Sequence, residues 1–189
     1  MPLATLIHRA SLPSPQVSAA QARQWLAEHY GLSGTLQALG SQQDLNFRVD
    51  SQRGRFVLKI CRGDYALVEL QAQHAGLKYL AEHAVVTVPR VIAANNSEDL
   101  LSLEVGGEAV HVRLLDYIEG QPLTHLDHLG RDVVAGFGRL CGEMDLALAG
   151  VDHPGLGRRL PGDARTPLSL IHHLFRGRGV EVAGDCRVG

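Results

Sequence analysis

The sequence predicts an α+β fold in which five antiparallel strands form one sheet and a single helix is inserted after the third strand. Three observations support this prediction. Short segments rich in β-favouring residues occur at 35–39, 45–50, 55–62, 100–105 and 109–117. One long segment with helical periodicity, 64–83, separates the third strand from the fourth. A second apolar helix is predicted over 129–149, after a Gly-Gln-Pro stop that ends the last strand.

Length and charge limit the classes of protein to which the chain can belong. Its 189 residues suffice for one good-sized domain or two small ones, and 45% of them are hydrophobic. The 18 basic and 20 acidic residues nearly balance, so the composition argues against nucleic acid or a membrane as a partner. Residues 1–9 lack the apolar core of a signal peptide, and no run reaches membrane-spanning length. We therefore expect a soluble, cytoplasmic protein.

Cysteine and histidine positions indicate no metal centre. The three cysteines, Cys61, Cys141 and Cys186, are an odd number without paired spacing, which is typical of reduced thiols in a cytosolic protein. The adjacent His172 and His173 would diverge on a helix, and no further ligand has suitable spacing. The sequence therefore predicts no metal ligands and assigns the cysteines no chemistry.

The N-terminal part is predicted to contain an arm and one helix. Residues 1–17 carry three prolines and little periodicity, as expected of an arm that lies over a surface. Ser18 is suited to cap a helix over 19–30, and Gly31 is suited to end it. Trp25 falls on the apolar face of this helix, so we expect it to pack in the core.

The strands at 35–39 and 45–50 are joined by a polar loop at 40–44, and a tight turn at 52–54 leads into the third strand. The loop contains Gly40, Ser41 and Gln42, whose small or polar character would let backbone N–H groups approach a phosphate. An ordinary hairpin loop would have the same composition, and the loop matches neither the P-loop nor the dinucleotide-binding pattern.

Lys59 lies in the middle of an otherwise apolar strand. A buried lysine needs an anion beside it, because an unpaired buried charge costs several kcal/mol. The alternative is an edge strand with Lys59 pointing into water. Glu69, in the helix at 64–83, lies off the apolar stripe formed by Leu67, Leu70, Leu77 and Leu80. We predict that Lys59 and Glu69 form an ion pair, the alternative being a solvated glutamate on an exposed helix face.

Taken together, these segments resemble the aminoglycoside-phosphotransferase-like small-molecule kinases, and among them the hydroxylysine-kinase-like branch. The resemblance extends over roughly residues 33–155 and is carried by the segments 40–49, 56–60, 88–91 and 112–122. It implies a protein-kinase-like small lobe followed by the start of a helical large lobe. It also implies ATP with Mg²⁺ as cofactor and a small amino-alcohol as substrate.

The same resemblance assigns roles to individual residues. Lys59 would bind the nucleotide phosphates and Glu69 would orient Lys59. The loop at 40–44, with Ser41 and Gln42, would cover the phosphates. The segment formed by Asp116, Tyr117 and Ile118 would be the hinge that meets adenine through main-chain groups.

The catalytic half of the family pattern is not found. Such kinases need an aspartate in a His-x-Asp-x-x-x-x-Asn motif and a second aspartate for the metal. The local candidate, His125-Leu126-Asp127, has Asp132 at the asparagine position and follows the hinge too closely to reach the cleft. We therefore predict neither a catalytic nor a metal-binding residue. The Arg- and Gly-rich segment 156–189 is what a truncated gene product or an atypical tail would contain.

The predicted organisation is an arm and helix over 1–32, a kinase-like small lobe over 33–118, a linker and first large-lobe helix over 119–155, and an atypical tail over 156–189. The first functional hypothesis is an ATP-dependent phosphotransferase acting on a small-molecule hydroxyl, of which this chain is an inactive fragment. The alternatives are a non-catalytic nucleotide-binding or protein-interaction module and a structural domain. We expect the helix at 129–149 to leave an apolar face exposed, which would promote self-association.

Overall fold

The structure is a computed structural model that describes residues 14–41, 43–83, 86–120 and 128–157. The chain divides into two compact units, and the unit Pro13–Leu156 contains all of the described helices and strands. The other unit combines Met1–Leu12 with Gly157–Gly189 and lies outside the described residues except for Gly157. The fold and the candidate site therefore both belong to the unit Pro13–Leu156.

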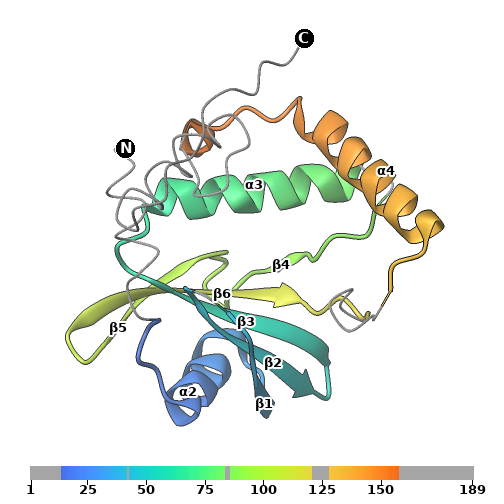
Figure 1. Ribbon diagram of the computed structural model, residues 1–189. Helices are drawn as coiled ribbons and strands as arrows, with labels where there is room; N and C mark the ends of the chain where they lie inside the picture. Colours follow the sequence, from blue (N-terminus) through green and yellow to red (C-terminus); the bar gives the residue numbers. More distant parts are fainter. Residues whose placement is uncertain (1–13, 42, 84–85, 121–127, 158–189) are drawn as a thin grey trace, which may run out of the picture. The chain divides into compact units, whose positions relative to one another are not determined.

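A six-stranded antiparallel sheet forms the centre of this unit, in agreement with the predicted α+β class (Figure 1). Its strands follow the order β1-β2-β3-β6-β4, and β5 also pairs with β6. Their bounds are β1 Gly34–Leu39, β2 Leu45–Ser51, β3 Gly54–Arg62, β4 Val91–Ile92, β5 Leu101–Val105 and β6 Glu108–Asp116. The sequence predicted five strands and missed β4, because a strand of two residues is too short to show an alternating pattern.

Two helices lie on opposite faces of the sheet (Figure 1). Helix α2, Ala19–Tyr30, begins and ends as predicted: the Ser18 hydroxyl accepts a hydrogen bond from the Gln21 N–H at 3.1 Å, and Gly31 has a φ of 61°. Helix α3, Leu67–His83, lies on the other face and begins three residues after the start of the predicted segment 64–83. Helix α4, Arg131–Leu148, and the short 3₁₀ helix η2, Pro154–Leu156, come after the sheet in the chain.

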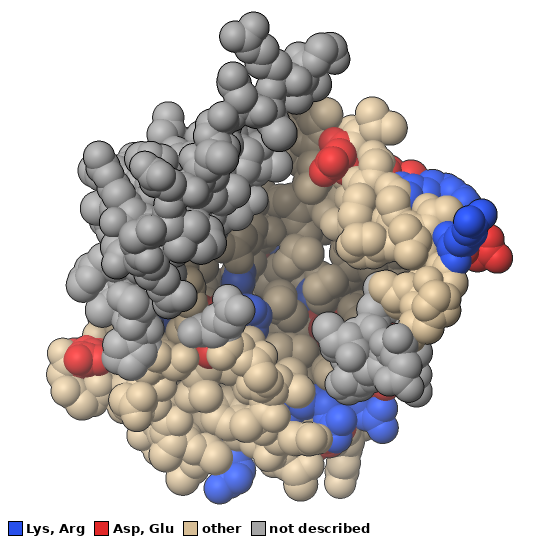
Figure 2. Space-filling view, in the orientation of Figure 1, with Lys and Arg blue, Asp and Glu red and all other residues tan. Residues whose placement is uncertain are grey.

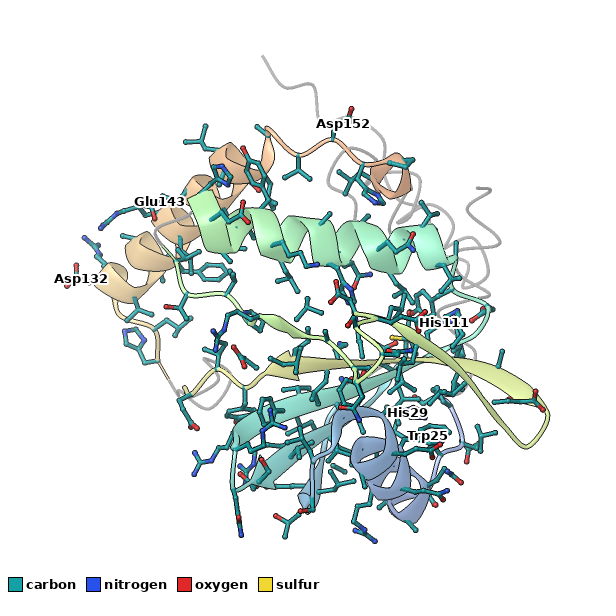
Figure 3. The ribbon with its side chains drawn as sticks, turned by 180° about the vertical axis from the view of Figure 1, so that it is seen from behind. Trp25, His29, His111, Asp132, Glu143 and Asp152 are labelled. Carbon is teal, nitrogen blue, oxygen red and sulfur yellow. The ribbon has the colours of Figure 1, made fainter. Side chains whose placement is uncertain are left out.

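The face of the sheet toward α2 is apolar and forms the core. Trp25, with 5% of its surface exposed, packs there as expected and is seen on α2 in Figure 3. The strands contribute every second residue, because side chains alternate between the two faces of a strand. The buried strand residues of this core include Phe47, Val49, Phe56, Leu58, Ile60, Val110, Val112 and Leu114.

The face toward α3 is polar. It carries the intervening residues of the same strands, among them Asn46, Lys59, Cys61, His111 and Arg113. A direct contact shows that this face meets α3, since the Arg113 side chain donates a hydrogen bond to Gln73 in the middle of that helix. The strand alternation thus separates an apolar core from a layer of charged groups.

Helix α4 has no buried residues. Its exposed apolar side chains are Val133, Val134, Phe137, Leu140 and Leu146. This is the exposed apolar face that was expected for 129–149, whereas self-association through it stays a prediction. None of the described helices is both long and apolar enough to cross a membrane.

Candidate functional site

Three polar residues form a row across neighbouring strands on the face toward α3. Asn46 of β2 is directly opposite Lys59 of β3, and Lys59 is directly opposite Arg113 of β6. Neighbouring strands lie about 5 Å apart, so side chains at matched positions emerge side by side on one face. We call Asn46, Lys59 and Arg113 the polar row.

Lys59 pairs with Asp44, and the predicted ion pair with Glu69 was wrong. The Lys59 Nζ lies 3.4 Å from the Asp44 Oδ2, and the two side chains are 23% and 18% exposed. The physical reason is the hairpin register. Asp44 precedes Asn46 by two residues and therefore comes out beside Lys59 on the same face, without any contribution from a helix.

Glu69 is only 8% exposed, so it is not the solvated glutamate of the alternative interpretation. The apolar stripe assigned to α3 was wrong in part, because Leu67 is 44% exposed while Leu70 and Leu80 are buried. The sheet face that α3 covers is polar: Gln73 of α3 accepts a hydrogen bond from Arg113 on that face, and Glu69 and His74 of the same helix are buried. Tertiary packing against a charged sheet has overridden the amphipathic pattern of the helix.

The loop at 40–44 is held by one hydrogen bond within the loop and by another to Tyr65. The Ser41 hydroxyl accepts a hydrogen bond from the Asp44 N–H at 3.2 Å, and the Tyr65 hydroxyl donates to the Gln43 side chain at 2.5 Å. Gln42, predicted to cover phosphates, lies outside the described residues. The loop ends at Asp44, whose carboxylate pairs with Lys59.

Arg113 is a buried cation whose hydrogen bonding is incomplete. Arg113 is only 4% exposed, and its Nη2 donates a hydrogen bond to the Gln73 Oε1 at 2.6 Å. Its Nε and Nη1 have no partner among the described residues, and neither has the buried Oδ1 of Asn46. A guanidinium does not lose its proton in a protein, so this charge persists and needs an acceptor.

Cationic groups are visible from outside on this side of the molecule. Figure 2 shows blue lysine and arginine atoms within the hollow above the sheet and beneath α3. An anion that entered the hollow would meet these groups.

The predicted hinge, Asp116 to Ile118, is fixed by its neighbours. The Asp116 carboxylate accepts from the Arg90 Nε at 2.6 Å, and the Tyr117 N–H donates to the Arg55 carbonyl at 3.1 Å. Ile118 is 44% exposed, and its N–H makes no backbone hydrogen bond within the described residues. Of the N–H groups in this segment, that of Ile118 is the one left for a ligand.

Cys61 and His111 share the polar face but have structural roles. Burial, and then the charge of Asp44, raise the pKa of the Cys61 thiol to about 11, so it stays protonated and unreactive at neutral pH. The His111 ring lies within hydrogen-bond distance of the Tyr65 carbonyl, at 3.2 Å, and of the Ser102 hydroxyl, at 3.1 Å. Both side chains are satisfied by the fold.

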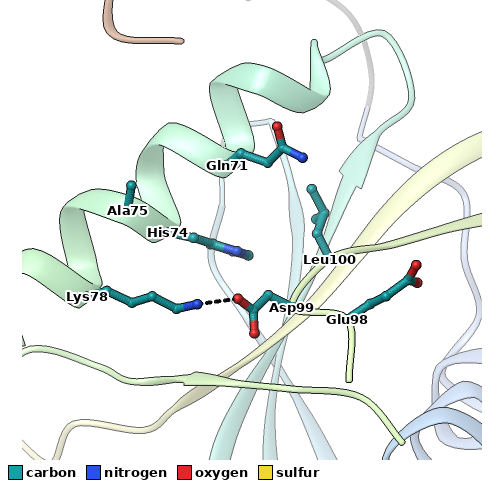
Figure 4. A pocket seen from close by; sticks show the side chains of 7 residues that line it. All are labelled: Gln71, His74, Ala75, Lys78, Glu98, Asp99 and Leu100. Atoms are coloured by element: carbon teal, nitrogen blue, oxygen red, sulfur yellow. Dashed lines mark hydrogen bonds and ion pairs between the residues drawn. The ribbon is translucent and has the colours of Figure 1, made fainter. Parts of the chain in front are cut away.

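A separate cavity of about 410 Å³ lies between α3 and the segment before β5 (Figure 4). Lys78 and Asp99 form an ion pair across it at 2.5 Å. His74 is 5% exposed, and its Nε2 has no partner in the described part of the chain. The lining residues are Gln71, His74, Ala75, Lys78, Glu98, Asp99 and Leu100.

The catalytic motif considered from the sequence, His125-Leu126-Asp127, falls in a segment that the structure does not describe. Asp127 lies outside the described residues. Asp132, in the first turn of α4, is exposed and points away from α3 and the sheet (Figure 3). Among the described residues, no three His, Cys, Asp or Glu side chains are grouped so that they could hold a metal ion.

Sequence reasoning did not single out three residues of the candidate site, Asp44, Asn46 and Arg113. The signal for Arg113 was available, because it lies in the apolar segment Val112-Arg113-Leu114-Leu115 just as Lys59 lies in Val57-Leu58-Lys59-Ile60. The signal for Asp44 was the register of the β2–β3 hairpin, which the sequence did not determine to the residue.

Comparisons with known proteins agree with this geometry. Residues 35–182 match the profile of the APH phosphotransferase enzyme family. A search of curated proteins finds no match. Among solved structures, a microcompartment-associated aminopropanol kinase is similar, with 21% identity and a TM-score of 0.63 over 77% of this chain and 45% of that one. An amicoumacin kinase, solved in complex with AMP-PNP, Ca²⁺ and Ami, gives 15% identity and a TM-score of 0.63 over 83% of this chain and 46% of its own.

At such identities the two structures support the fold alone. The chain spans less than half the length of either. The family itself is established by the profile, which covers most of the sequence. The chain belongs to the APH phosphotransferase enzyme family.

Proposed function

We propose that this chain binds ATP on the polar face of its sheet and is the small lobe of a kinase that phosphorylates a small-molecule hydroxyl. The observation that carries the proposal is Lys59, a half-buried lysine on a central strand beneath the polar loop at 40–44. Its position suits a group that binds phosphate oxygens, because a lysine there presents a positive charge at the floor of a hollow.

In this proposal the nucleotide lies between the loop and the hinge. Asp44 is the current counter-ion of Lys59, and phosphate oxygens would take its place. Ile118 would offer its N–H to the adenine ring, since the N–H groups of Asp116 and Tyr117 are engaged by Arg90 and Arg55. Glu69, which α3 holds toward the same sheet face, would orient Lys59 once Asp44 is displaced.

Mg²⁺ supplies charge neutralisation along the phosphates and enters here as part of the nucleotide complex. The described residues provide no cluster of metal-ligating side chains, so we assign no metal ligand. The amicoumacin kinase structure contains AMP-PNP together with Ca²⁺, which supports a nucleotide with a divalent cation for this chain as well.

The acceptor that we propose is a small amino-alcohol, the class to which aminopropanol belongs. We place the protein in the cytoplasm, where ATP is available. An alternative is a non-catalytic module that binds nucleotide or a protein partner, with self-association through the exposed residues of α4. The observation that favours this alternative is the apolar face of α4, which has no buried residue.

Isothermal titration with ATP and Mg²⁺ tests the nucleotide proposal. We expect the 1–189 chain to bind ATP weakly and the Lys59→Ala variant to lose about tenfold or more in affinity, as expected for a charge-assisted hydrogen bond. Lys78→Ala is the matched control, because Lys78 is paired with Asp99 beside the separate cavity. Absence of binding in both proteins, or equal binding to the native chain and Lys59→Ala, would refute the proposal.

Turnover is the second expected outcome. Phosphoryl transfer needs an oriented hydroxyl, a base for its proton and neutralised phosphate charge, and no catalytic or metal-binding aspartate is assigned in this chain. We expect purified residues 1–189 to release no ADP above background with 5-hydroxylysine, aminopropanol or an aminoglycoside. ADP release is the measurement, and Asp127→Ala is the control. Turnover that Asp127→Ala abolishes would show that Asp127 is catalytic after all.

A further inference from the structure

We infer that the whole polar row, and not Lys59 alone, forms the anion-binding surface, with Arg113 and Asn46 as direct phosphate ligands on either side of the lysine. This inference deepens the proposed function and rests on it. It assigns a polyphosphate-binding role to two residues outside the positions that the sequence indicated.

The first step is the alignment of the three residues. Asn46, Lys59 and Arg113 occupy matched positions on three consecutive strands, so their side chains emerge in one line on one face. Spacing of about 5 Å between strands extends this line over about 10 Å, a length comparable to that of a chain of linked phosphates. A single phosphate could contact two members, and a polyphosphate could contact all three.

Arg113 and Asn46, the two residues on either side of Lys59, both have buried polar atoms without a hydrogen-bond partner among the described residues. Arg113 is more than nine-tenths buried, yet its Nε and Nη1 have no partner among the described residues, and its Nη2 is bound only by the neutral amide of Gln73. The Asn46 Oδ1 is also buried without a partner in that part of the chain; because this oxygen accepts, the Nδ2 of the same amide is the group that could donate to a phosphate. A buried guanidinium is stable when an anion satisfies it, and a phosphate accepts from its planar fork with good geometry.

The third step is the charge balance around the row. The row carries two positive charges, and the ion pair found there joins Lys59 to Asp44. The charges of Asp44, Arg113 and Lys59 all act on the pKa of Cys61, so the three groups are gathered around one thiol. Like charges directly opposite on neighbouring strands repel. An incoming phosphate would relieve that repulsion and replace both Asp44 and Gln73 as acceptors.

Pyrophosphate is the probe, because it carries the phosphate charge without the base or sugar. Isothermal titration of the 1–189 chain is expected to show binding that weakens about tenfold to a hundredfold in Arg113→Met and in Lys59→Met. Arg113→Lys keeps the charge and loses the fork, so its loss should be smaller than that of Arg113→Met. Lys78→Met, which removes a lysine paired with Asp99 beside the separate cavity, should leave the affinity unchanged. Melting curves identify any variant that fails to fold, in which case Arg113→Lys decides the question.

Gln73→Leu distinguishes an Arg113 that contacts phosphate directly from an Arg113 that only holds α3 in place through Gln73. If Arg113 binds phosphate, removing its competing acceptor should leave pyrophosphate affinity the same or higher. If Arg113 only holds α3 in place, Gln73→Leu should weaken binding as much as Arg113→Met does, and the inference falls. ATP binding that depends on Lys59 but not on Arg113 or Asn46 would overturn this inference and leave the proposed function standing. No ATP binding at all would remove the proposed function first.

Discussion

Leu114→Ala should lower the free energy of unfolding by about 2–5 kcal/mol, the range measured for truncating a fully buried leucine. Leu114 has no exposed surface and lies on β6, the strand that pairs with β3, β4 and β5. It is directly opposite Leu58, which is also fully buried, in the core beneath α2. Removal of its side chain would leave a cavity that the paired strands cannot close, because their hydrogen bonds hold the backbone in place.

Chemical denaturation is the measurement, and Leu146→Ala is the matched control. Leu146 is 80% exposed on α4, so the same substitution there should change stability by less than about 0.5 kcal/mol. Similar effects at the two positions would contradict the assignment of the core to the α2 side of the sheet.

Acidification should destabilise the protein through His74. Burial, and then the positive charge of Arg113, lower the pKa of His74 from 6.5 to about 4 in the folded state. Between these two pH values the unfolded chain binds a proton that the folded chain does not bind, so stability falls as the pH decreases through that window. The free energy of unfolding should decrease by about 3 kcal/mol in total, and this loss is complete only below the pKa that His74 has in the folded state.

The test compares the native chain with His74→Gln by denaturation at several pH values between 7 and about 4. The variant lacks the titrating group, so its stability should decrease less over this range. His83→Gln, on the same helix and exposed, should follow the native curve. A His74→Gln curve parallel to the native one would show that folding does not lower the pKa of His74.

The first two residues of the predicted hinge illustrate what the sequence could not supply. Asp116 and Tyr117 were assigned together with Ile118 from a resemblance that treats the segment as a unit. The structure distinguishes them, because Arg90 and Arg55 from other parts of the chain accept their N–H groups through backbone carbonyls. Such long-range hydrogen bonds are set by strand pairing and are invisible to local pattern.

Local chemistry determined much of the fold from the sequence alone. Ser18 and Gly31 fixed the two ends of α2, because an N-cap hydroxyl and a left-handed glycine act within one turn of their own residue. Segments rich in β-favouring residues predicted the strands β2, β3 and β6, whereas their division into a core face and a polar face was seen only in the structure. Lys59 was singled out as a candidate from the sequence, because a charge within an apolar strand requires an anion.

Tertiary structure decided which anion that is, and which residues share it. Asp44 reaches Lys59 because the β2–β3 register brings them together. Arg113 lies beside Lys59 because β6 pairs with β3, although more than 50 residues separate Lys59 from Arg113 in the sequence. Periodicity gave α3 an apolar stripe, but the charged sheet face turned Glu69 and His74 inward. Register and helix rotation depend on interactions summed over the whole sheet, so no short segment of the sequence contains them.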